Sequence, residues 1–418
     1  MKKIVIVNCS ESIGGAAIAS RRLFDALRRE GVDASMIVRD KSGVNHNVYS
    51  LTNGSWDRLR NKFNFLYERM VILLNNGFRR DRLFSVSLAN SGIAIHNHPA
   101  VLEADIIHLH WINQGMLSLS EIRALIKTGK PIVWTLHDMW PITAICHHAR
   151  SCELNQTHCD RCPQLLGIKR DLSYSLFNRK QKLYDGSNIS FVACSEWLGG
   201  LAKISALTKG CSVSSIPNPI DTNKFYPSVS QEDRVRMGLP LDKRLILFGA
   251  LNITDPRKGI AYLIDALKII AKDREDIELV VFGQVKQELH SMLPFKIHSM
   301  GYLSSESDIV SLYNAVDIFV TPSLEENLPN TIMEAISCGT PCVGFKIGGI
   351  PEMIDHMRSG YVAEYCSAED LARGITVTLD SENYSNFSSE ARNKAVMAYG
   401  ESTIAKRYIS LYDSLLSK

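Results

Sequence analysis

Short runs of consecutive apolar residues alternate with helical patterns along the chain, and this alternation limits the fold more than any other feature. Such runs occur at 3–8, 34–39, 104–111, 131–136 and 189–194, and again at 244–249, 277–283, 317–321 and 341–345. Continuous apolar strands that alternate with helices are typical of a parallel sheet covered on both faces. The sequence therefore predicts an α/β protein with two doubly wound, Rossmann-like domains.

A segment rich in Pro, Asn and Asp at 216–239 separates the two series of strands and looks like a linker. We therefore expect an N-terminal domain at 1–216 and a C-terminal domain at 217–400. Residues 1–200 hold 25 Lys and Arg against 17 Asp and Glu, whereas residues 201–418 hold 22 against 27. This contrast suggests that the domains have different partners. Ligands of such sheets bind at the carboxyl ends of the strands, so a site between the domains is expected.

The composition, with 45% apolar and 22% charged residues, is that of an ordinary globular protein. No apolar run approaches the roughly 20 residues that a membrane span needs. The first run is also shorter than the apolar core of a signal peptide, which has about 7–15 residues, so we expect a cytoplasmic protein. The basic residues are dispersed and form no recognisable module, so no nucleic-acid partner is expected.

The most informative stretch is 321–353, which reads TPSLEENLPNTIMEAISCGTPCVGFKIGGIPEM. Glu326 falls in a loop after an expected strand, and Glu334 falls about one turn into the following helix. Amides at the start of a helix favour a phosphate. The amides expected to face a ligand here are those of Asn327, Leu328, Asn330 and Thr331.

This stretch resembles the signature of retaining glycosyltransferases of family-4 type, which have the GT-B fold. That signature has two glutamates separated by seven residues, followed by Ala, a small residue and Cys-Gly, and the matching residues are Glu326, Glu334, Ala335, Cys338 and Gly339. The resemblance implies that Glu326 contacts hydroxyls of the donor sugar and that Glu334 contacts the ribose. The alternative is that both glutamates are solvated or cap the helix.

Three further segments match donor-binding positions of the same family, namely Gly14-Gly15, Arg257-Lys258 and Tyr302-Leu303. By resemblance, the glycine loop faces the donor phosphate, and Lys258 with Arg257 neutralises the diphosphate. The backbone at Tyr302 and Leu303 contacts the nucleobase. The alternatives are a plain strand-to-helix turn for the glycines and a solvated pair at a helix start for Arg257 and Lys258.

A histidine near the end of the strand expected at 131–136 also matches the family, in which a His lies near the reacting centre. His137 occupies this position, and with Glu326 it is our candidate catalytic residue. His110 and Trp111 are expected to line the acceptor pocket, because aromatic rings stack on sugar faces. The alternative for His110 is packing at a strand end.

Four of the ten cysteines, Cys146, Cys152, Cys159 and Cys162, cluster in a loop at 146–162 with the spacing C-x5-C-x6-C-x2-C. In a reducing compartment such a cluster suggests a structural zinc ion. Paired disulfides and free thiols are the alternatives. We expect no cofactor for catalysis.

An amphipathic helix is expected at 56–75, with apolar residues recurring every three or four positions. Its apolar residues are Trp56, Leu59, Phe63, Leu66, Met70 and Leu73, and its basic residues are Arg58, Arg60, Lys62 and Arg69, with Arg79, Arg80 and Arg82 following. A basic amphipathic helix can lie on an anionic bilayer, and relatives that act on lipid-linked sugars dock in this way. The alternative is a helix packed on the domain with a solvated charged face.

Taken together, the resemblance implies a retaining, metal-independent hexosyltransferase. It would move a sugar from a UDP- or GDP-sugar to a hydroxyl of a saccharide, lipid-linked, in O-antigen or exopolysaccharide synthesis, at the inner face of the membrane. The family also has a final helix, here at 401–418, that crosses back to the first domain. The alternatives are an epimerase or phosphorylase on the same fold, or a non-catalytic nucleotide-sugar-binding subunit.

Overall fold

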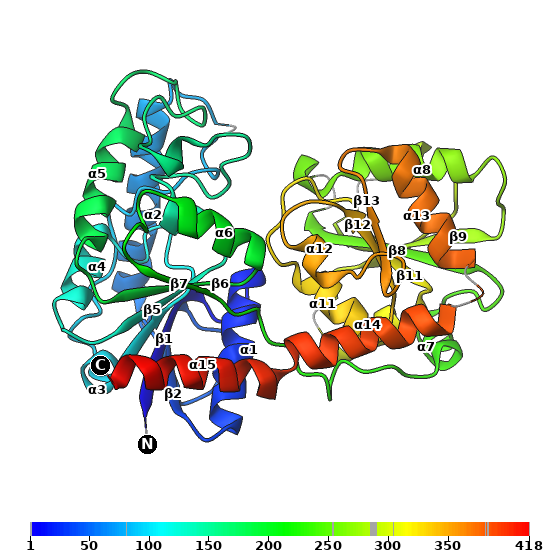
Figure 1. Cartoon of the computed structure of the whole chain (residues 1–418), viewed down its shortest axis with the longest axis horizontal. Coiled ribbons are helices and arrows are strands. Elements are labelled where there is room, and N and C mark those ends of the chain that lie inside the picture. Colours follow the sequence, from blue (N-terminus) through cyan, green and yellow to red (C-terminus); the bar gives the residue numbers. More distant parts are fainter. Residues whose placement is uncertain are drawn as a thin grey trace. The chain divides into compact units, whose positions relative to one another are not determined.

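The computed structural model describes residues 2–417 except 81, 253–254, 285–290, 304, 381 and 383. Contacts divide the chain into two compact units (Figure 1). Unit 1 comprises Met1–Pro219 together with Ile404–Lys418, and unit 2 comprises Ile220–Thr403. Each unit is built on one parallel sheet, as the alternation of apolar runs and helices predicts.

Unit 1 contains a seven-stranded sheet in the order β3-β2-β1-β4-β5-β6-β7. Its strands are β1 Lys3–Ser10, β2 Asp33–Asp40, β3 Val48–Ser50, β4 Ile106–Leu109, β5 Ile132–Leu136, β6 Ile189–Ala193 and β7 Ser212–Ser215. All of the strand pairs are parallel. The strand order reverses between β1 and β4, and ligands of such sheets bind at the carboxyl ends beside this point.

Helices cover both faces of the unit 1 sheet. They are α1 Gly15–Arg29, α2 Ser55–Asn75, α3 Pro99–Glu103, α4 Leu119–Ile126, α5 Leu172–Tyr184, α6 Glu196–Ile204 and α15 Glu401–Leu416. Helices α1 and α15 share one core cluster with the sheet, and α3 to α6 contribute to the cluster on the other face. The last helix of the chain is therefore part of the core of unit 1.

Polar contacts fix α15 within this core. His108 of β4 is fully buried, with Nδ1 lying 2.8 Å from the Tyr412 hydroxyl and Nε2 lying 2.8 Å from Oγ1 of Thr135. The Thr135 hydroxyl also lies 2.9 Å from that of Tyr408. Burial lowers the pKa of His108 to about 3, so the imidazole is neutral and can both donate and accept.

Unit 2 contains a six-stranded sheet in the order β10-β9-β8-β11-β12-β13, which reverses between β8 and β11. Its strands are β8 Arg244–Asn252, β9 Ile277–Gln284, β10 Ile297–Gly301, β11 Ile318–Thr321, β12 Cys342–Phe345 and β13 Gly360–Ala363. Its helices are α7 Ser230–Met237, α8 Ile260–Ile270, α10 Glu306–Ala315, α11 Asn330–Ser337, α12 Ile350–Met353, α13 Ala368–Asp380 and α14 Tyr384–Tyr399. One face of the sheet is covered by α8 and α13.

Helix α7 lies within the segment that we expected to be a linker, and the linker prediction is wrong for its residues. Arg234 of this helix is buried and pairs with Asp317, at 2.8 Å between Nη2 and Oδ2. Asp317 also accepts a hydrogen bond from the amide of Leu245 at 2.6 Å. Because a buried ion pair rather than an apolar stripe attaches α7, its sequence lacks the apolar period that predicts a helix.

None of the helices in the described part of the chain is long and apolar enough to cross a membrane.

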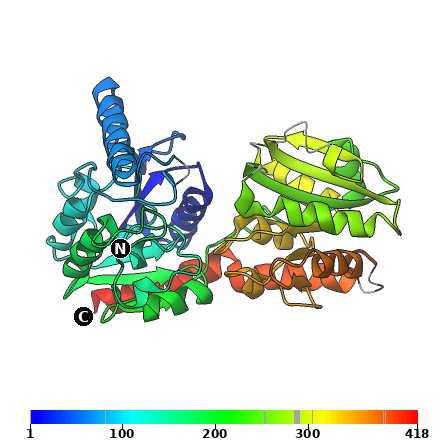
Figure 2. The ribbon, with the colours of Figure 1, turned by 90° about the horizontal axis from the view of Figure 1, so that it is seen from above.

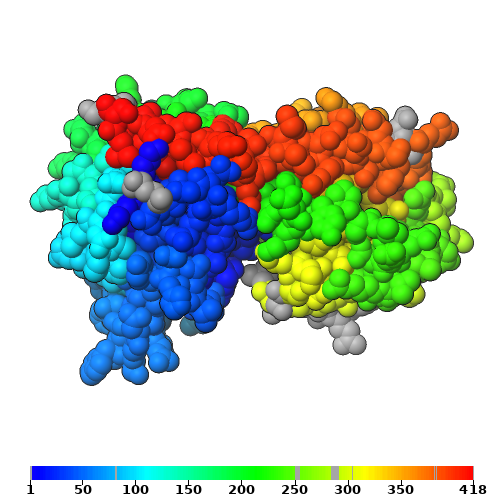
Figure 3. All heavy atoms as spheres, turned by 90° about the horizontal axis from the view of Figure 1, so that it is seen from below, coloured from blue at the N-terminus to red at the C-terminus, as the bar shows by residue number. Residues whose placement is uncertain are grey.

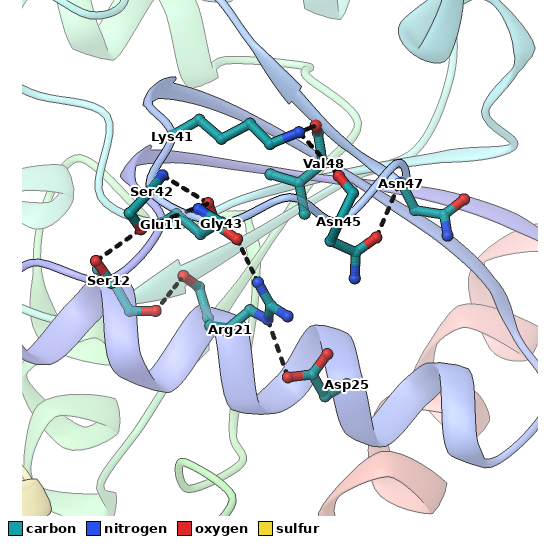
Figure 4. A network of polar contacts seen from close by, with 12 residues as sticks. Glu11, Ser12, Arg21, Asp25, Lys41, Ser42, Gly43, Asn45, Asn47 and Val48 are labelled. Atoms are coloured by element: carbon teal, nitrogen blue, oxygen red, sulfur yellow. Dashed lines mark hydrogen bonds and ion pairs between the residues drawn. The ribbon is translucent and has the colours of Figure 1, made fainter. Parts of the chain in front are cut away.

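A buried carboxylate fixes the loop that follows β1. Glu11 is 2% exposed and accepts hydrogen bonds from the amides of Ser42 and Gly43, both at 2.8 Å (Figure 4). It also forms an ion pair with Arg21 of α1. Burial favours the neutral acid, but the two amides and the charges of Arg21 and Lys41 outweigh it and lower the pKa of Glu11. The network ties together the loops after β1 and β2.

We predict that Glu11→Gln destabilises the protein at pH 7 by about 1–2 kcal/mol, because a charged hydrogen-bond acceptor is lost. The pKa of Glu11 is lower in the folded state than in the unfolded state. The carboxylate therefore stabilises the fold at pH values above its ordinary pKa. This stabilisation is lost as the pH falls through the folded-state pKa. Thermal unfolding at pH 7 and near pH 3 measures the difference.

Asp25→Asn is the matched control. Asp25 pairs with the same Arg21 at 2.9 Å but lies nearer the surface, so its loss should cost less than about 0.5 kcal/mol. Equal unfolding temperatures for Glu11→Gln and the unmodified protein at pH 7 would contradict the role of Glu11.

Candidate active site

Three loops at the carboxyl edge of the unit 2 sheet interlock through their backbones. Gly259, which follows β8 and precedes α8, has a φ of +68°, and a Cβ there would lie 1.8 Å from the carbonyl oxygen of Pro322. Gly348, after β12, has a φ of +57°, and a Cβ there would lie 1.8 Å from the carbonyl oxygen of Glu326. The loop after β11 is therefore held between two positions that only glycine can occupy.

Hydrogen bonds reinforce this clamp on both sides. The amide of Leu324 donates to the carbonyl oxygen of Arg257 at 2.7 Å, and that of Gly349 donates to the carbonyl oxygen of Asn327 at 2.8 Å. All three loops lie beside the strand-order reversal between β8 and β11, the position where such sheets bind ligands.

The clamp brings Lys258 and Glu326 together, although they are 68 residues apart. The distance from Nζ of Lys258 to Oε2 of Glu326 is 2.7 Å. Both side chains are partly exposed, at 33% and 20% respectively, so a ligand can reach them. The structure thus places a cation and a carboxylate side by side at a ligand-binding edge.

Arg257, the expected partner of Lys258, is paired with a residue of its own loop. Its Nη2 donates to Oδ2 of Asp255 at 2.6 Å, and the Arg257 amide donates to Oδ1 of the same carboxylate at 3.0 Å. This pairing raises the pKa of Arg257 and directs part of its guanidinium to Asp255.

Glu334 lies in α11, one turn after the clamped loop, and is 8% exposed. The hydroxyl of Tyr313 lies 3.3 Å from its Oε2. Burial, and then the nearby Glu334, raises the pKa of Tyr313 well above its ordinary value, so the phenol stays protonated and can donate to the carboxylate. Sequence reasoning missed Tyr313 because it lies in a different helix, α10.

The start of α11 supplies backbone donors next to these carboxylates. The residue before the helix is Pro329, whose side chain has no acceptor, so it cannot cap the first amides. Asn330 and Thr331 open the helix and are partly buried, whereas Asn327 and Leu328 in the preceding loop are buried. The side chains of Asn327 and Leu328 therefore offer little surface to a ligand.

The predicted nucleobase segment follows β10, at the edge of the sheet. Tyr302 is 71% exposed and Leu303 is partly buried. In unit 1, the predicted glycine loop follows β1, and Gly14 has a φ of +95° directly before α1. Both glycines of this loop are exposed.

His137 and His110 form a stacked pair at the carboxyl ends of β5 and β4. Nε2 of His137 lies 2.8 Å from Nδ1 of His110, and their ring centroids are 5.1 Å apart. Burial lowers the pKa of His137 to about 4, with Asp138 opposing the shift, so the imidazole is neutral at pH 7. His110, which we expected to line the acceptor pocket, is 3% exposed and lies against His137.

Trp111 belongs to a second polar chain. Its Nε1 donates to Oδ2 of Asp138 at 2.9 Å, and the same oxygen lies 2.7 Å from Nδ1 of His147. Nε2 of His147 lies 2.9 Å from the hydroxyl of Ser87. Burial would favour the neutral acid, but His147 and the amide of Trp140 outweigh it, so the pKa of Asp138 lies well below its usual value.

His147 was not among the predicted site residues. In the sequence, His147 lies between two of the clustered cysteines, and this position did not indicate a contact with Asp138. The available signal was that a histidine lies ten positions after His137.

The four clustered cysteines are thiols that line one cavity, together with residues of the loop after β5. Within the described ranges, no group of three or more His, Cys, Asp or Glu side chains already stands in a metal-binding arrangement.

Helix α2 presents the apolar side chains of the expected stripe to solvent. Trp56, Leu59, Phe63, Leu66 and Met70 are between 49% and 84% exposed. The residues of α2 that are buried are mostly polar, namely Asn61, Asn64, Glu68, Arg69 and Ile72. The first turns of the helix stand clear of the body of unit 1 (Figures 2 and 3).

The polar side of α2 is buried because it binds two backbone amides. Oε1 of Glu68 accepts from Leu88 at 2.6 Å and from Ala89 at 2.9 Å, and Oε2 pairs with Arg69 at 2.7 Å. Arg69, which we expected on the charged outer face, is therefore buried. Leu73 is partly buried, and Arg58, Lys62, Arg79 and Arg80 are exposed.

Comparisons with known proteins agree with this geometry. The profile of the family described as Glycosyltransferase Family 4 matches residues 13–224, and the profile described as Glycosyl transferases group 1 matches residues 242–381. The first lies in unit 1 and the second in unit 2.

One relative matches nearly the whole chain, and another matches half of it. WcaC of Escherichia coli, named as a colanic acid biosynthesis glycosyl transferase, is 23% identical over 96% of this chain and 97% of its own length. The N,N'-diacetylbacillosaminyl-diphospho-undecaprenol alpha-1,3-N-acetylgalactosaminyltransferase of Campylobacter jejuni is 29% identical over 50% of this chain, which spans about half (55%) of that protein.

A solved structure, HepE (Alr3699) of Anabaena in complex with UDP, superposes with a TM-score of 0.64 at 18% identity and covers 99% of this chain and 100% of its own. The Glycosyltransferase Family 4 profile covers half of the chain, and the chain belongs to this family, with the two-domain GT-B fold.

Proposed function

We propose that the protein transfers a sugar from a nucleotide-sugar to a hydroxyl of a lipid-linked saccharide, with retention at the anomeric carbon. The observation that carries the proposal is the pair of Lys258 and Glu326, 2.7 Å apart on interlocked loops beside the start of α11. A cation and helix amides suit a diphosphate, and a carboxylate suits sugar hydroxyls, so the two halves of a nucleotide-sugar find complementary groups here.

In this proposal, the departing diphosphate is stabilised by Lys258, by the guanidinium of Arg257 and by the first amides of α11. Fixed cations and amides directed at developing negative charge lower the barrier to bond cleavage. Because these groups supply the positive charge, the transfer would proceed without a metal ion.

Glu326 would hold the hydroxyls of the donor sugar, and Glu334 would hold the ribose. Tyr313 would orient Glu334 through its hydroxyl, and the glycine clamp would fix the backbone of Glu326. The acceptor attacks from the side of the departing phosphate, whose oxygen takes the acceptor proton, so configuration at the anomeric carbon is retained.

His137 would act as a neutral hydrogen-bonding group near the reacting centre. Burial lowers its pKa to about 4, which makes a protonated imidazole unfavourable at pH 7. His110, at 2.8 Å, would orient the ring, and the indole of Trp111, held by Asp138, would offer a face to the acceptor sugar.

The lipid-linked acceptor is supported by two relatives whose names include a sugar linked to undecaprenol through a diphosphate. It is also supported by the exposed apolar stripe of α2, which would rest in the surface of an anionic membrane while the nearby basic residues contact headgroups. UDP is the favoured nucleotide, since HepE binds it.

An epimerase or phosphorylase on the same fold would consume the donor without a saccharide acceptor, and a non-catalytic subunit would bind the donor without consuming it. Assays with and without acceptor distinguish these functions from transfer.

We predict that one of UDP, GDP and ADP, or its sugar conjugate, raises the melting temperature of the protein. With that donor, Glu326→Gln should lower the transfer rate by about a hundredfold or more, because a contact to the reacting sugar is lost. Affinity for the nucleoside diphosphate, measured by calorimetry, should change by less than about threefold, since its phosphates contact Lys258 rather than Glu326.

Glu364→Gln, an exposed carboxylate of the same unit, is the control and should leave both values unchanged. Normal turnover in Glu326→Gln would refute the role of Glu326, and the absence of binding by every nucleotide-sugar would refute the proposed function.

We also predict that Trp56→Ser combined with Phe63→Ser weakens binding to vesicles that contain anionic lipid by at least about tenfold. Each exposed ring contributes roughly 1.5–3 kcal/mol when it is buried in an apolar phase. Sedimentation with vesicles at low salt measures the effect.

Val44→Ser with Leu102→Ser removes two exposed apolar side chains elsewhere on unit 1 and should leave vesicle binding intact. Equal loss in both double variants, or no loss in the first, would contradict docking through α2.

A further inference from the structure

A second group of exposed apolar and basic side chains lies beside the end of α2 in unit 1. It belongs to the segment 161–170 just before α5, which we call the 161–170 loop. Leu166 and Ile168 of this loop are 44% and 58% exposed. The loop also carries three exposed cations and no acidic residue, and the cations are Arg161, Lys169 and Arg170.

Two carboxylates close the base of the 161–170 loop. Oδ1 of Asp160 accepts hydrogen bonds from the amides of Arg161 at 2.9 Å and of Arg170 at 2.6 Å. Oδ2 of Asp171 accepts from the amide of Cys162 at 2.7 Å. The two acids that flank the loop are thus bound to its backbone, and they hold its two ends together. The apolar side chains and the cations are left exposed on a closed loop.

The backbone does not explain why arginine stands at both ends of the loop. Arg161 and Arg170 have φ angles of +51° and +57°, in the left-handed region that residues other than glycine rarely adopt. Glycine would adopt this conformation at a lower cost. The arginine side chains therefore add something that the turn itself does not need.

The 161–170 loop is in contact with the end of α2. A Cβ at Gly77, two residues after α2, would lie 3.2 Å from Cδ2 of Leu166. Nη1 of Arg82 donates to Oε1 of Gln164 at 2.8 Å and joins the same two segments a second time. Phe78, which is also exposed, lies between α2 and this contact in the sequence. The loop therefore continues the exposed apolar stripe of α2.

The mixture of side chains favours a lipid surface over a protein partner. Charged residues are depleted from the cores of protein interfaces, whereas here a lysine directly follows the more exposed apolar residue, Ile168. At an anionic bilayer, apolar side chains enter the boundary between headgroups and acyl chains, and neighbouring Lys and Arg side chains contact the headgroups. The 161–170 loop offers both kinds of group within ten residues.

We propose that the 161–170 loop is a second membrane anchor of unit 1. Leu166 and Ile168 enter the surface of an anionic bilayer, and the three cations of the loop contact its headgroups. This inference rests on the proposed function, in which α2 docks on a membrane. Two joined anchors bind more tightly than either alone, because the second binds at a high local concentration. An anchor beside the end of α2 would also stop the helix from rolling about its axis on the surface.

The test is sedimentation of the full chain with vesicles of phosphatidylglycerol and phosphatidylcholine at low salt. Leu166→Ser with Ile168→Ser should weaken binding by about tenfold or more, because two side chains no longer enter the apolar phase. Leu102→Ser with Ile204→Ser is the matched control. It removes a leucine and an isoleucine of similar exposure, 56% and 51%, elsewhere on unit 1, and should leave binding unchanged.

A charge-reversing pair tests the contact with headgroups. Lys169→Glu with Arg170→Glu should weaken binding at low salt by about tenfold, and the loss should shrink at high salt because ions screen the attraction. Arg123→Glu with Lys127→Glu, which reverses two exposed cations of α4, should have no such effect.

A second measurement uses the unmodified protein. In hydrogen exchange followed by mass spectrometry, anionic vesicles should slow exchange at 166–169 as well as in α2, and vesicles of phosphatidylcholine alone should not. Unchanged binding after Leu166→Ser with Ile168→Ser, or slower exchange in α2 alone, would overturn the proposal while docking through α2 stands. If the unmodified protein binds no anionic vesicle, both docking proposals are wrong. Calorimetry with the nucleotide remains a separate test of the transferase site.

Discussion

The close approach of the loops around Glu326 is the constraint on which the proposed donor site depends. Two glycines in left-handed conformations leave room for the carbonyl oxygens of Pro322 and Glu326, where any side chain would overlap them. The loop after β11 therefore has one backbone path, and this path sets the distance between Lys258 and Glu326. Recognition of a donor then needs little rearrangement, since the groups that would bind it are already held in place.

In unit 1, burial rather than backbone contact sets the chemistry. It keeps the histidines at the ends of β4 and β5 neutral, so they act as hydrogen-bonding groups and not as acids. Asp138 stays ionised in spite of its burial, because His147 and the amide of Trp140 stabilise the carboxylate. The two units thus present different chemistry at their strand ends: fixed charges at partly exposed positions in unit 2, and neutral rings beside the ionised Asp138 in unit 1.

Much of the fold could be predicted from the sequence, because buried parallel strands leave uninterrupted apolar runs. The strands at 131–136 and 317–321 lie within one or two residues of β5 and β11. Helix α7 was missed because an ion pair attaches it, and the burial of Arg69 in α2 was missed because it depends on the pairing with Glu68. Tyr313 and His147 could not be predicted as partners of Glu334 and Asp138, because these contacts depend on how separate elements pack.

The most direct test of the donor site is a crystal structure with a bound nucleoside diphosphate. The account predicts a phosphate oxygen within hydrogen-bonding distance of Nζ of Lys258 and of the first amides of α11, with the ribose at Glu334. A nucleotide bound elsewhere on unit 2, with Lys258 still paired to Glu326 and no phosphate beside it, would contradict the account.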